Sequence, residues 1–307
     1  MKKNIFFITI FVFIQAYAAI DFDASMQIDS YQFQELPIIQ ELLPLSRRLY
    51  ATYNLDQVTF QEYEKIPKIM HHVWFGRPLS QEDKALRKTW EDMHPDWRFV
   101  LWTDRIDNDP RGIVVHSWQE LQNLLLLTDE RYIVVDVAPL QFDNRKFFDA
   151  SRNYGEKSDI IKYEIVYRIG GVYIDCDFEC LKPLDPLHHA YDFYTGIQPL
   201  DTNYAQLGAA LFAAHPGHEI LKYAVQTIER DRGFGPIVIR SGPIHFSRAF
   251  IARAGIDDSV DIAFPTSFFY PCGYHQKNTT RSSWIQPESF AVHHWAGSWL
   301  IPEAFEQ

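Results

Sequence analysis

The chain has 307 residues, of which 47% are hydrophobic and 15% aromatic. It can therefore bury a substantial core in one large or two modest domains, and this composition excludes a disordered chain. The formal net charge is −11. Because no basic stretch could neutralise a phosphate backbone, the sequence argues against a nucleic-acid partner.

The N-terminus has the pattern of a secretory signal. Lys2 and Lys3 precede an apolar run from Ile5 to Ile14, and Ala16-Tyr17-Ala18 offers small residues for cleavage. We expect residues 1–18 to be a signal peptide and the protein to be exported, as a secreted, periplasmic or lumenal protein. The alternative is a single N-terminal membrane anchor, although an apolar run of about 10 residues is short of the roughly 20 that span a bilayer.

The remaining chain divides into an N-terminal helical extension at 19–64, with a helix expected at Leu42–Leu49, and a main domain at 65–307. In the main domain strands and helices alternate. A strand is expected at Lys68–Trp74, a helix at Ser80–Met93 and a strand at Trp97–Trp102. This alternation predicts an α/β fold, with a mixed, mostly parallel sheet flanked by helices.

The later elements follow from the same patterns. Helices are expected at Ser117–Leu127 and His218–Arg230, and strands at Tyr191–Ile197, Ala205–Ala214, Ile262–Tyr270 and Phe290–Trp295. The segment Tyr132–Phe148 is ambiguous. Its pattern indicates neither a helix nor a strand clearly.

An acidic pair follows an apolar strand in the middle of the chain. Gly170-Gly171 opens the β-branched and aromatic run Val172–Ile174, and Asp175 and Asp177 come directly after it. Residues two apart in an extended chain point to one face, and the carboxyl ends of strands in open α/β sheets bind ligands. Two carboxylates suit Mg²⁺ or Mn²⁺ shared with substrate phosphates. A solvated turn is the alternative for the pair alone.

A helix is expected before that strand. Ser158 is a candidate N-cap, apolar residues recur every four positions to Ile169, and Gly170 stands where a C-terminal glycine belongs. On this helix Asp159 and Lys162 lie one turn apart, away from the apolar stripe. Taken alone, they predict an exposed ion pair worth a few tenths of a kcal/mol.

Three ordered motifs resemble those of one enzyme family. They are Ile66–Gly76 (IPKIMHHVWFG), the run from Ser158-Asp159 to Asp177 with Leu181–Leu184 after it, and His293–Trp299 (HHWAGSW). Together they resemble glycosyltransferase family 32, which contains fungal mannosyltransferases and is similar to the cores of clostridial glucosylating toxins. The resemblance covers roughly 66–300. It implies a GT-A-type fold, the nucleotide-diphospho-sugar transferase fold.

The resemblance also implies roles for the residues of the middle motif. Asp177 would bind the metal, and Asp175 the ribose hydroxyl and a metal-bound water, so that these two residues form the catalytic pair. Asp159 would bind ribose or sugar hydroxyls, and Lys162 the sugar or phosphate. The family usually has arginine at Lys162, and lysine lacks the bidentate fork of arginine.

The two outer motifs would complete the donor site. Trp74 would stack on the base, with a core tryptophan as the alternative. His294 would be a third metal ligand, and Ser298 and Trp299 would reach the diphosphate. Aromatic tails also simply pack, which is the alternative for this segment.

The resemblance implies a retaining glycosyltransferase that uses Mn²⁺ or Mg²⁺. The donor would be a UDP- or GDP-hexose and the acceptor a glycan, a lipid or a protein, with peripheral membrane association left open. A rival hypothesis is a metal-dependent nucleotide-sugar hydrolase or phosphoesterase, although such sites cluster more metal ligands. Another rival is a secreted, non-catalytic carbohydrate-binding protein.

Three cysteines, Cys176, Cys180 and Cys272, permit at most one internal disulfide. A bond between Cys176 and Cys180 would constrain the acidic pair. Unpaired, buried cysteines are the favoured expectation, and no zinc-binding spacing is present.

Overall fold

The structure is a computed structural model, and it describes residues 20–26, 36–106, 111–199, 205–231 and 235–300. The expected signal peptide or anchor at 1–18 lies outside these residues. Within the described part of the chain, no helix combines the length and the apolar character needed to cross a membrane.

The central element is an eight-stranded sheet in the order β3-β4-β2-β1-β5-β8-β7-β9. Its strands are β1 (Ile69–Trp74), β2 (Arg98–Thr103), β3 (Gly112–Val114), β4 (Tyr132–Asp136), β5 (Gly171–Ile174), β7 (Phe193–Ile197), β8 (Leu207–Ala214) and β9 (Asp261–Phe264). Neighbouring strands from β3 to β5 are parallel, β8 is antiparallel to both β5 and β7, and β7 and β9 are parallel. The expected mixed, mostly parallel α/β sheet is confirmed.

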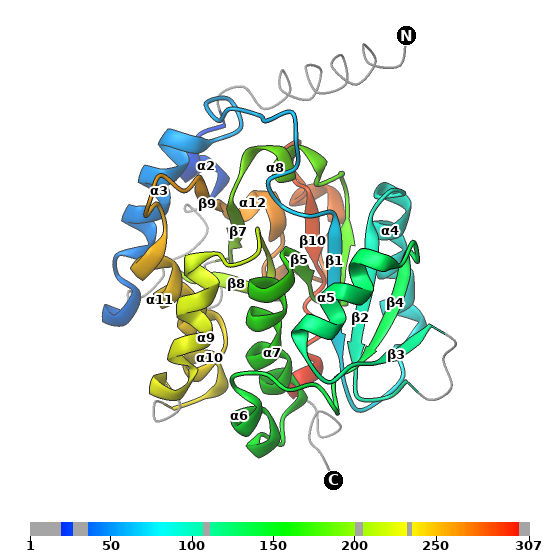
Figure 1. Ribbon diagram of the computed structural model, residues 1–307. Coiled ribbons are helices and arrows are strands. Elements are labelled where there is room, and N and C mark those ends of the chain that lie inside the picture. The colour runs from blue at the N-terminus through cyan, green and yellow to red at the C-terminus, as the bar shows by residue number, and fades with distance from the viewer. Residues whose placement is uncertain (1–19, 27–35, 107–110, 200–204, 232–234, 301–307) are drawn as a thin grey trace.

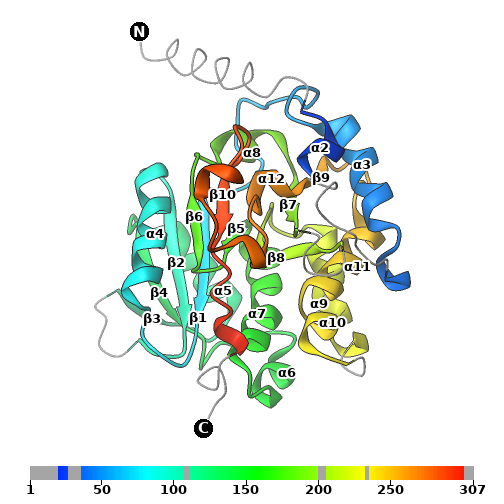
Figure 2. The ribbon, with the colours of Figure 1, turned by 180° about the vertical axis from the view of Figure 1, so that it is seen from behind.

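Helices cover both faces of this sheet (Figures 1 and 2). Those of the main domain are α4 (Gln81–Met93), α5 (Trp118–Leu127), α6 (Arg145–Ala150), α7 (Tyr154–Ile169), α8 (Asp185–Ala190), α9 (Glu219–Asp231), α10 (Ile237–Arg240), α11 (Pro243–Arg253) and α12 (Thr266–Phe269). Helix α7 packs on β1, β5 and β8, and α9 packs on α7 and α11. Buried on both faces, strands such as β5 and β8 have no exposed residue, which explains their continuous apolar sequence.

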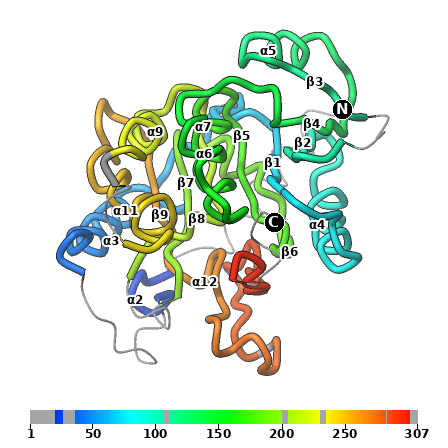
Figure 3. The backbone as a smooth tube through the Cα atoms, turned by 90° about the horizontal axis from the view of Figure 1, so that it is seen from below, coloured from blue at the N-terminus to red at the C-terminus, as the bar shows by residue number. Residues whose placement is uncertain are grey.

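A small second sheet lies beside the end of β5. It pairs β6 (Phe178–Cys180) antiparallel to β10 (Ala291–His293), so that the chain near residue 293 returns to the acidic pair. Short 3₁₀ turns complete this part of the chain, namely η4 (Tyr274–Gln276), η5 (Arg281–Ser283) and η6 (Ser298–Leu300). In Figure 3 α12 lies on the side of the sheet opposite α7 and α9.

The N-terminal extension packs into the same core as the main domain. Its described elements are α2 (Phe22–Ser25), η2 (Pro37–Ile39) and α3 (Leu42–Tyr53). Helix α3 contacts β9 and α11, and α2 contacts α12. The division of the chain at residue 64 stays a prediction.

Two expected elements differ from the structure. Helix α7 begins at Tyr154 with Asn153 as its N-cap, whereas the sequence pattern favoured Ser158 as the N-cap. The strand expected at Ile262–Tyr270 ends at Phe264, because Pro265 begins the short helix α12. The ambiguous segment Tyr132–Phe148 contains both a strand, β4, and the start of a helix, α6.

Candidate functional site

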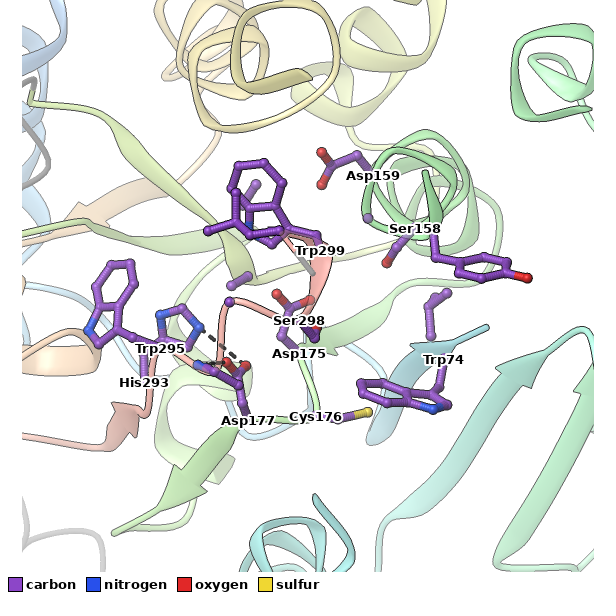
Figure 4. A pocket seen from close by; sticks show the side chains of 18 of the residues that line it. Trp74, Ser158, Asp159, Asp175, Cys176, Asp177, His293, Trp295, Ser298 and Trp299 are labelled. Carbon is purple, nitrogen blue, oxygen red and sulfur yellow. Dashed lines mark hydrogen bonds and ion pairs between the residues drawn. The ribbon is translucent and has the colours of Figure 1, made fainter. Parts of the chain in front are cut away.

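A pocket of about 580 Å³ opens at the carboxyl ends of β1 and β5 (Figure 4). Its lining brings together all three motifs identified in the sequence. The lining residues used below are Trp74, Ser158, Asp159, Lys162, Asp175, Asp177, Gln198, Gln206, Ile237, Val238, His293, Trp295, Ser298 and Trp299.

The acidic pair meets a histidine inside this pocket. One ligand atom each from Asp175, Asp177 and His293 lies within 4.8 Å of the others. His293 Nε2 is 3.2 Å from Asp177 Oδ1, and its Nδ1 is buried without a hydrogen-bond partner. Two carboxylates and one imidazole form a donor set for a divalent cation, and the partnerless nitrogen is one more indication that the ring is available for a ligand.

The small sheet explains why this histidine is His293 and not the expected His294. In the β6–β10 pair, His293 stands opposite Phe178, the residue after Asp177, and its ring stacks on the Phe178 ring at 4.7 Å. Successive strand side chains point to opposite faces. His294 therefore turns away, and its Nε2 lies 3.0 Å from Glu179 Oε2, a carboxylate that also binds Arg281. The structure does not bring His294 to the acidic pair.

Asp175 is held by a neighbour two residues back on the same face. The Tyr173 hydroxyl donates to Asp175 Oδ1 at 2.5 Å, and Ser158 Oγ lies 3.1 Å from that hydroxyl. Burial, together with the charge of Asp175, raises the pKa of Tyr173 well above its ordinary value, so the phenol stays protonated and donates. The orientation of the Asp175 carboxylate is thereby fixed before any ligand arrives.

The pKa values of the two carboxylates in the pair are shifted in opposite directions. Burial raises the pKa of Asp175, and the negative charge of Asp177 adds to this effect. Burial also acts to raise the pKa of Asp177, but His293 and a hydrogen bond from the Ala296 amide outweigh it and lower that pKa. Two partly buried carboxylates this close repel each other, and a bound cation would remove that cost.

Asp159 and Lys162 form a buried ion pair, not the exposed one expected from the helix pattern. Their charged atoms are 2.6 Å apart, and the side chains are only 13% and 4% exposed. Burial raises the pKa of Asp159 to about 6, with Lys162 opposing the shift. The Lys162 ammonium also lies 5.0 Å from the centre of the Tyr173 ring. The pair is thus part of the pocket wall beside Asp175.

Trp74 lies at the end of β1 and is partly exposed to the pocket, whereas Val73 and Phe75 on either side are buried. Its indole N–H donates to the Arg77 carbonyl at 2.7 Å, and the Arg77 guanidinium lies 5.4 Å from the ring centre. The ring is held in place without being part of the core. Its stacking on a base stays a prediction.

The C-terminal segment reaches the same pocket. Ser298 and Trp299 belong to η6, which contacts α7, and both residues line the pocket. Trp299 is 39% exposed, so it does not simply pack in the core. All three cysteines are buried and none of them forms a disulfide, as favoured from the sequence.

Several residues that line the pocket or support its lining escaped the sequence reasoning. His293 was part of a recognised doublet, but only the pairing of β10 with β6 decides which member faces the pocket. Tyr173 could have been found, because it shares a strand face with Asp175. Gln198 and Gln206, which hydrogen-bond to each other at 2.7 Å, come from separate strand ends and left no sequence signal.

Comparison with known proteins confirms the resemblance. Residues 80–194 match the family described as the glycosyltransferase sugar-binding region containing the DXD motif. This segment includes Asp159, Lys162, Asp175 and Asp177. Over this segment the chain is therefore similar to the sugar-binding region of that family, and the segment runs through the central part of the mixed sheet described above.

Two fungal relatives are similar over part of their length. Inositol phosphoceramide mannosyltransferase 3 of Schizosaccharomyces pombe is 25% identical over 75% of this chain and 60% of its own. Mannosyl phosphorylinositol ceramide synthase SUR1 of Saccharomyces cerevisiae is 27% identical over 53% of this chain and 35% of its own. The chain thus spans at most about three fifths of these two relatives.

A solved structure, the PaToxG glycosyltransferase, aligns with a TM-score of 0.47 and 17% identity, over 73% of this chain and 80% of that one.

Proposed function

We propose that the protein is a retaining glycosyltransferase that moves a hexose from a nucleotide-diphosphate sugar to an acceptor, with a divalent cation held by Asp175, Asp177 and His293. The observation that carries the proposal is the meeting of these three side chains in a pocket that also contains the Asp159–Lys162 pair. The matched sugar-binding region supports the same reaction class.

The chain's own residues fit such a cation. Asp175 is oriented by Tyr173, and Asp177 is oriented by the Ala296 amide. His293 is held by the stacked Phe178 ring and has a partnerless buried nitrogen. A nitrogen ligand is less suited to Mg²⁺ or Ca²⁺, which prefer oxygen, so Mn²⁺ is the favoured ion. When bound, the cation would neutralise the charge on the leaving diphosphate.

The remaining pocket residues would bind the donor around that point. Trp74 would carry the base, as the family resemblance implies, and Asp159 would accept hydrogen bonds from ribose or sugar hydroxyls. Lys162 keeps the Asp159 carboxylate in position and supplies positive charge near Asp175. With a cation held by Asp175, Asp177 and His293, the charge of the departing diphosphate would be stabilised on this side of the pocket, and an acceptor that attacks the sugar on that same face would retain the configuration.

The acceptor of the sugar and the export of the protein are further parts of the proposal. Both fungal relatives are named for transfer of mannose to an inositol phosphoceramide. A mannose-type hexose and a polar-headgroup lipid are therefore the first donor sugar and acceptor to test, with glycan and protein acceptors next. Export into the secretory pathway, predicted from residues 1–18, is consistent with such acceptors.

The decisive experiment measures nucleotide release from UDP- and GDP-hexoses, with Mn²⁺ or with chelator, in the presence and absence of acceptors. We expect release that requires Mn²⁺ and rises with an acceptor, together with a labelled product. Equal release without acceptor would indicate the rival hydrolase. Binding of a glycan without any release would indicate the rival carbohydrate-binding protein.

A further inference from the structure

The C-terminal segment is attached at two points of the pocket wall. At one point the Ala296 N–H donates to Asp177 Oδ2 at 2.9 Å. At the other, Asn153 Nδ2 donates to the Trp299 carbonyl at 2.9 Å. The backbone here turns sharply, with φ at 54° for Trp295 and 64° for Gly297. A non-glycine residue in this region is strained, and such strain persists where the surroundings impose it.

Asn153 uses both ends of its amide. Its Oδ1 accepts from the Glu156 N–H at 3.0 Å and so caps the first turn of α7. Its Nδ2 is the group that holds Trp299. The side chain is buried, and a serine could replace the cap but not the long-range donor.

Gly155 leaves room for the same segment. A Cβ added at Gly155 would lie 2.5 Å from Trp299 Cβ, a separation that real Cβ contacts do not show. The φ of Gly155 is not in the left-handed region, so the backbone does not require glycine. Because glycine is less favourable than alanine within a helix, its presence is explained by the close approach of Trp299.

We propose that Asn153 and Gly155 are positioning residues, which seat the segment Ser298–Leu300 on the start of α7 and so hold Ser298 and Trp299 at the donor pocket. Both act through this segment, and Gly155 also lines the pocket itself. The consequence for donor binding rests on the proposed function, whereas the seating itself does not.

Two variants separate seating from folding. Asn153→Ser keeps an N-cap and removes the donor to Trp299, and Gly155→Ala adds a methyl group that meets Trp299 and lies 3.0 Å from Asn153 Oδ1. By helix preference alone, Gly155→Ala should stabilise the protein or leave it unchanged. The control is Ser117→Ala, which removes the N-cap of a different helix, α5.

The first measurement is hydrogen exchange of a peptide covering 294–300 in the full chain, alongside thermal unfolding. We expect faster exchange of this peptide in both variants, with unfolding temperatures near that of the wild type. Ser117→Ala should lower the unfolding temperature and leave this peptide unchanged. Wild-type exchange in both Asn153→Ser and Gly155→Ala would overturn the proposal.

The second measurement is binding of GDP and UDP with Mn²⁺. We expect the Kd of the bound diphosphate to rise about tenfold in both variants, the upper range for one lost hydrogen bond, while the Kd for Mn²⁺ alone stays the same. Faster exchange of the peptide with an unchanged Kd for the diphosphate would show that the position of Ser298–Leu300 does not affect nucleotide binding, and would overturn that part of the proposal. If the wild type binds neither nucleotide, the proposed function fails. The hydrogen-exchange result still tests whether Asn153 and Gly155 hold the segment Ser298–Leu300 on α7.

Discussion

At the scale of single residues, burial decides what the charged groups of the pocket can do. On its own helix the pair Asp159 and Lys162 has the spacing of a solvated ion pair, yet both side chains are nearly inaccessible. The reason is that α7 buries most of its circumference against the sheet on one side and α9 and α6 on others. A helical pattern identifies the pairing of two charges, but the neighbours that remove water from them belong to distant parts of the chain.

This burial predicts a pH dependence for donor binding. The pKa of Asp159 is raised from its ordinary value to about 6, so the carboxylate gains a proton as the pH falls through 6. A neutral acid no longer accepts two hydroxyl hydrogen bonds. At saturating Mn²⁺, we expect kcat/KM for the donor to fall about tenfold per pH unit below 6. The measurement is a pH profile from pH 7 to pH 5.

The control for this profile is Asp159→Asn, which has no carboxylate to protonate at this position. Its kcat/KM should be low at pH 7 and nearly constant down to pH 5. An acid limb of the same shape in Asp159→Asn and the wild type would assign the titration to another group.

A second residue-scale prediction concerns Trp74, whose ring is partly exposed at the pocket while its neighbours are buried. Trp74→Ala should weaken nucleotide binding by about 1–3 kcal/mol, the range for loss of stacking on an aromatic ring, and leave the fold intact. The matched control is Trp102→Ala in the fully buried Trp102, which should cost about 3–5 kcal/mol of stability. Calorimetric titration with UDP and GDP and thermal unfolding measure the two effects. A Trp74→Ala protein that unfolds but binds nucleotide normally would make Trp74 a core residue.

At the scale of elements, the β6–β10 pair brings together the residues of the proposed cation site. It joins residues more than a hundred positions apart, and its register places His293 beside Asp177 and His294 beside Glu179. The sequence identified the histidine doublet and the acidic pair. It could not give the register between two three-residue strands, and a shift of one residue exchanges the two faces.

The same pairing makes the two histidines a matched pair for mutation. His293→Ala should abolish high-affinity Mn²⁺ binding and Mn²⁺-dependent activity, because it removes one of three ligands. His294→Ala removes a side chain that contacts Glu179 at the outer side of the same strand pair, so Mn²⁺ affinity should be retained. Titration calorimetry with Mn²⁺ distinguishes them. If His294→Ala lost the metal and His293→Ala kept it, the original expectation for His294 would be restored.

Some helix boundaries are set by residues nearby in the sequence, and others by residues far away in it. The helix at Gln81–Met93 was predictable because Ser80 and Asp83 form a local capping box. The start of α7 was not, since its cap Asn153 lies upstream of the recognised motif and is itself fixed by the C-terminal segment. Where a boundary depends on side chains nearby in the sequence, the pattern is sufficient.

At the scale of the whole molecule, the mixed, mostly parallel type of the sheet followed from the alternating patterns, and the three motifs were expected to meet at one pocket, which they line together. The antiparallel insertion of β8 between β5 and β7 did not follow from these patterns, because both neighbours are equally apolar. The packing of α2 and α3 onto the end of the sheet was not foreseen either. The apolar residues of α2 and α3 show that these helices bury one side, but the strand and helices that cover that side lie far away in the sequence.

The last prediction concerns the stability of the folded protein. A ligand that binds only the folded state raises the free energy of unfolding, by about 2.7 kcal/mol when its concentration is a hundred times Kd. For a protein of this size, Mn²⁺ with GDP or UDP should then raise Tm by roughly 5 °C or more. Asp177→Asn keeps the side-chain shape but removes the charge that binds the cation. Its Tm without ligand should be slightly below that of the wild type near pH 7, because His293 and the Ala296 amide lower the pKa of Asp177 and so stabilise its charged form in the folded state.

With both ligands present, Asp177→Asn should show little or no rise in Tm, and its kcat should be at least about 100-fold lower than that of the wild type. Differential scanning fluorimetry over a matrix of Mn²⁺ and nucleotide concentrations, with chelator as the reference, tests the stability statement, and a turnover assay on the same proteins tests the other. We expect the effect to depend on both ligands together, because Asp175, Asp177 and His293 would hold a cation whose positive charge would also attract the diphosphate. A full nucleotide shift in the presence of chelator, or an unchanged shift in Asp177→Asn, would place nucleotide binding away from the acidic pair and contradict the proposed mechanism.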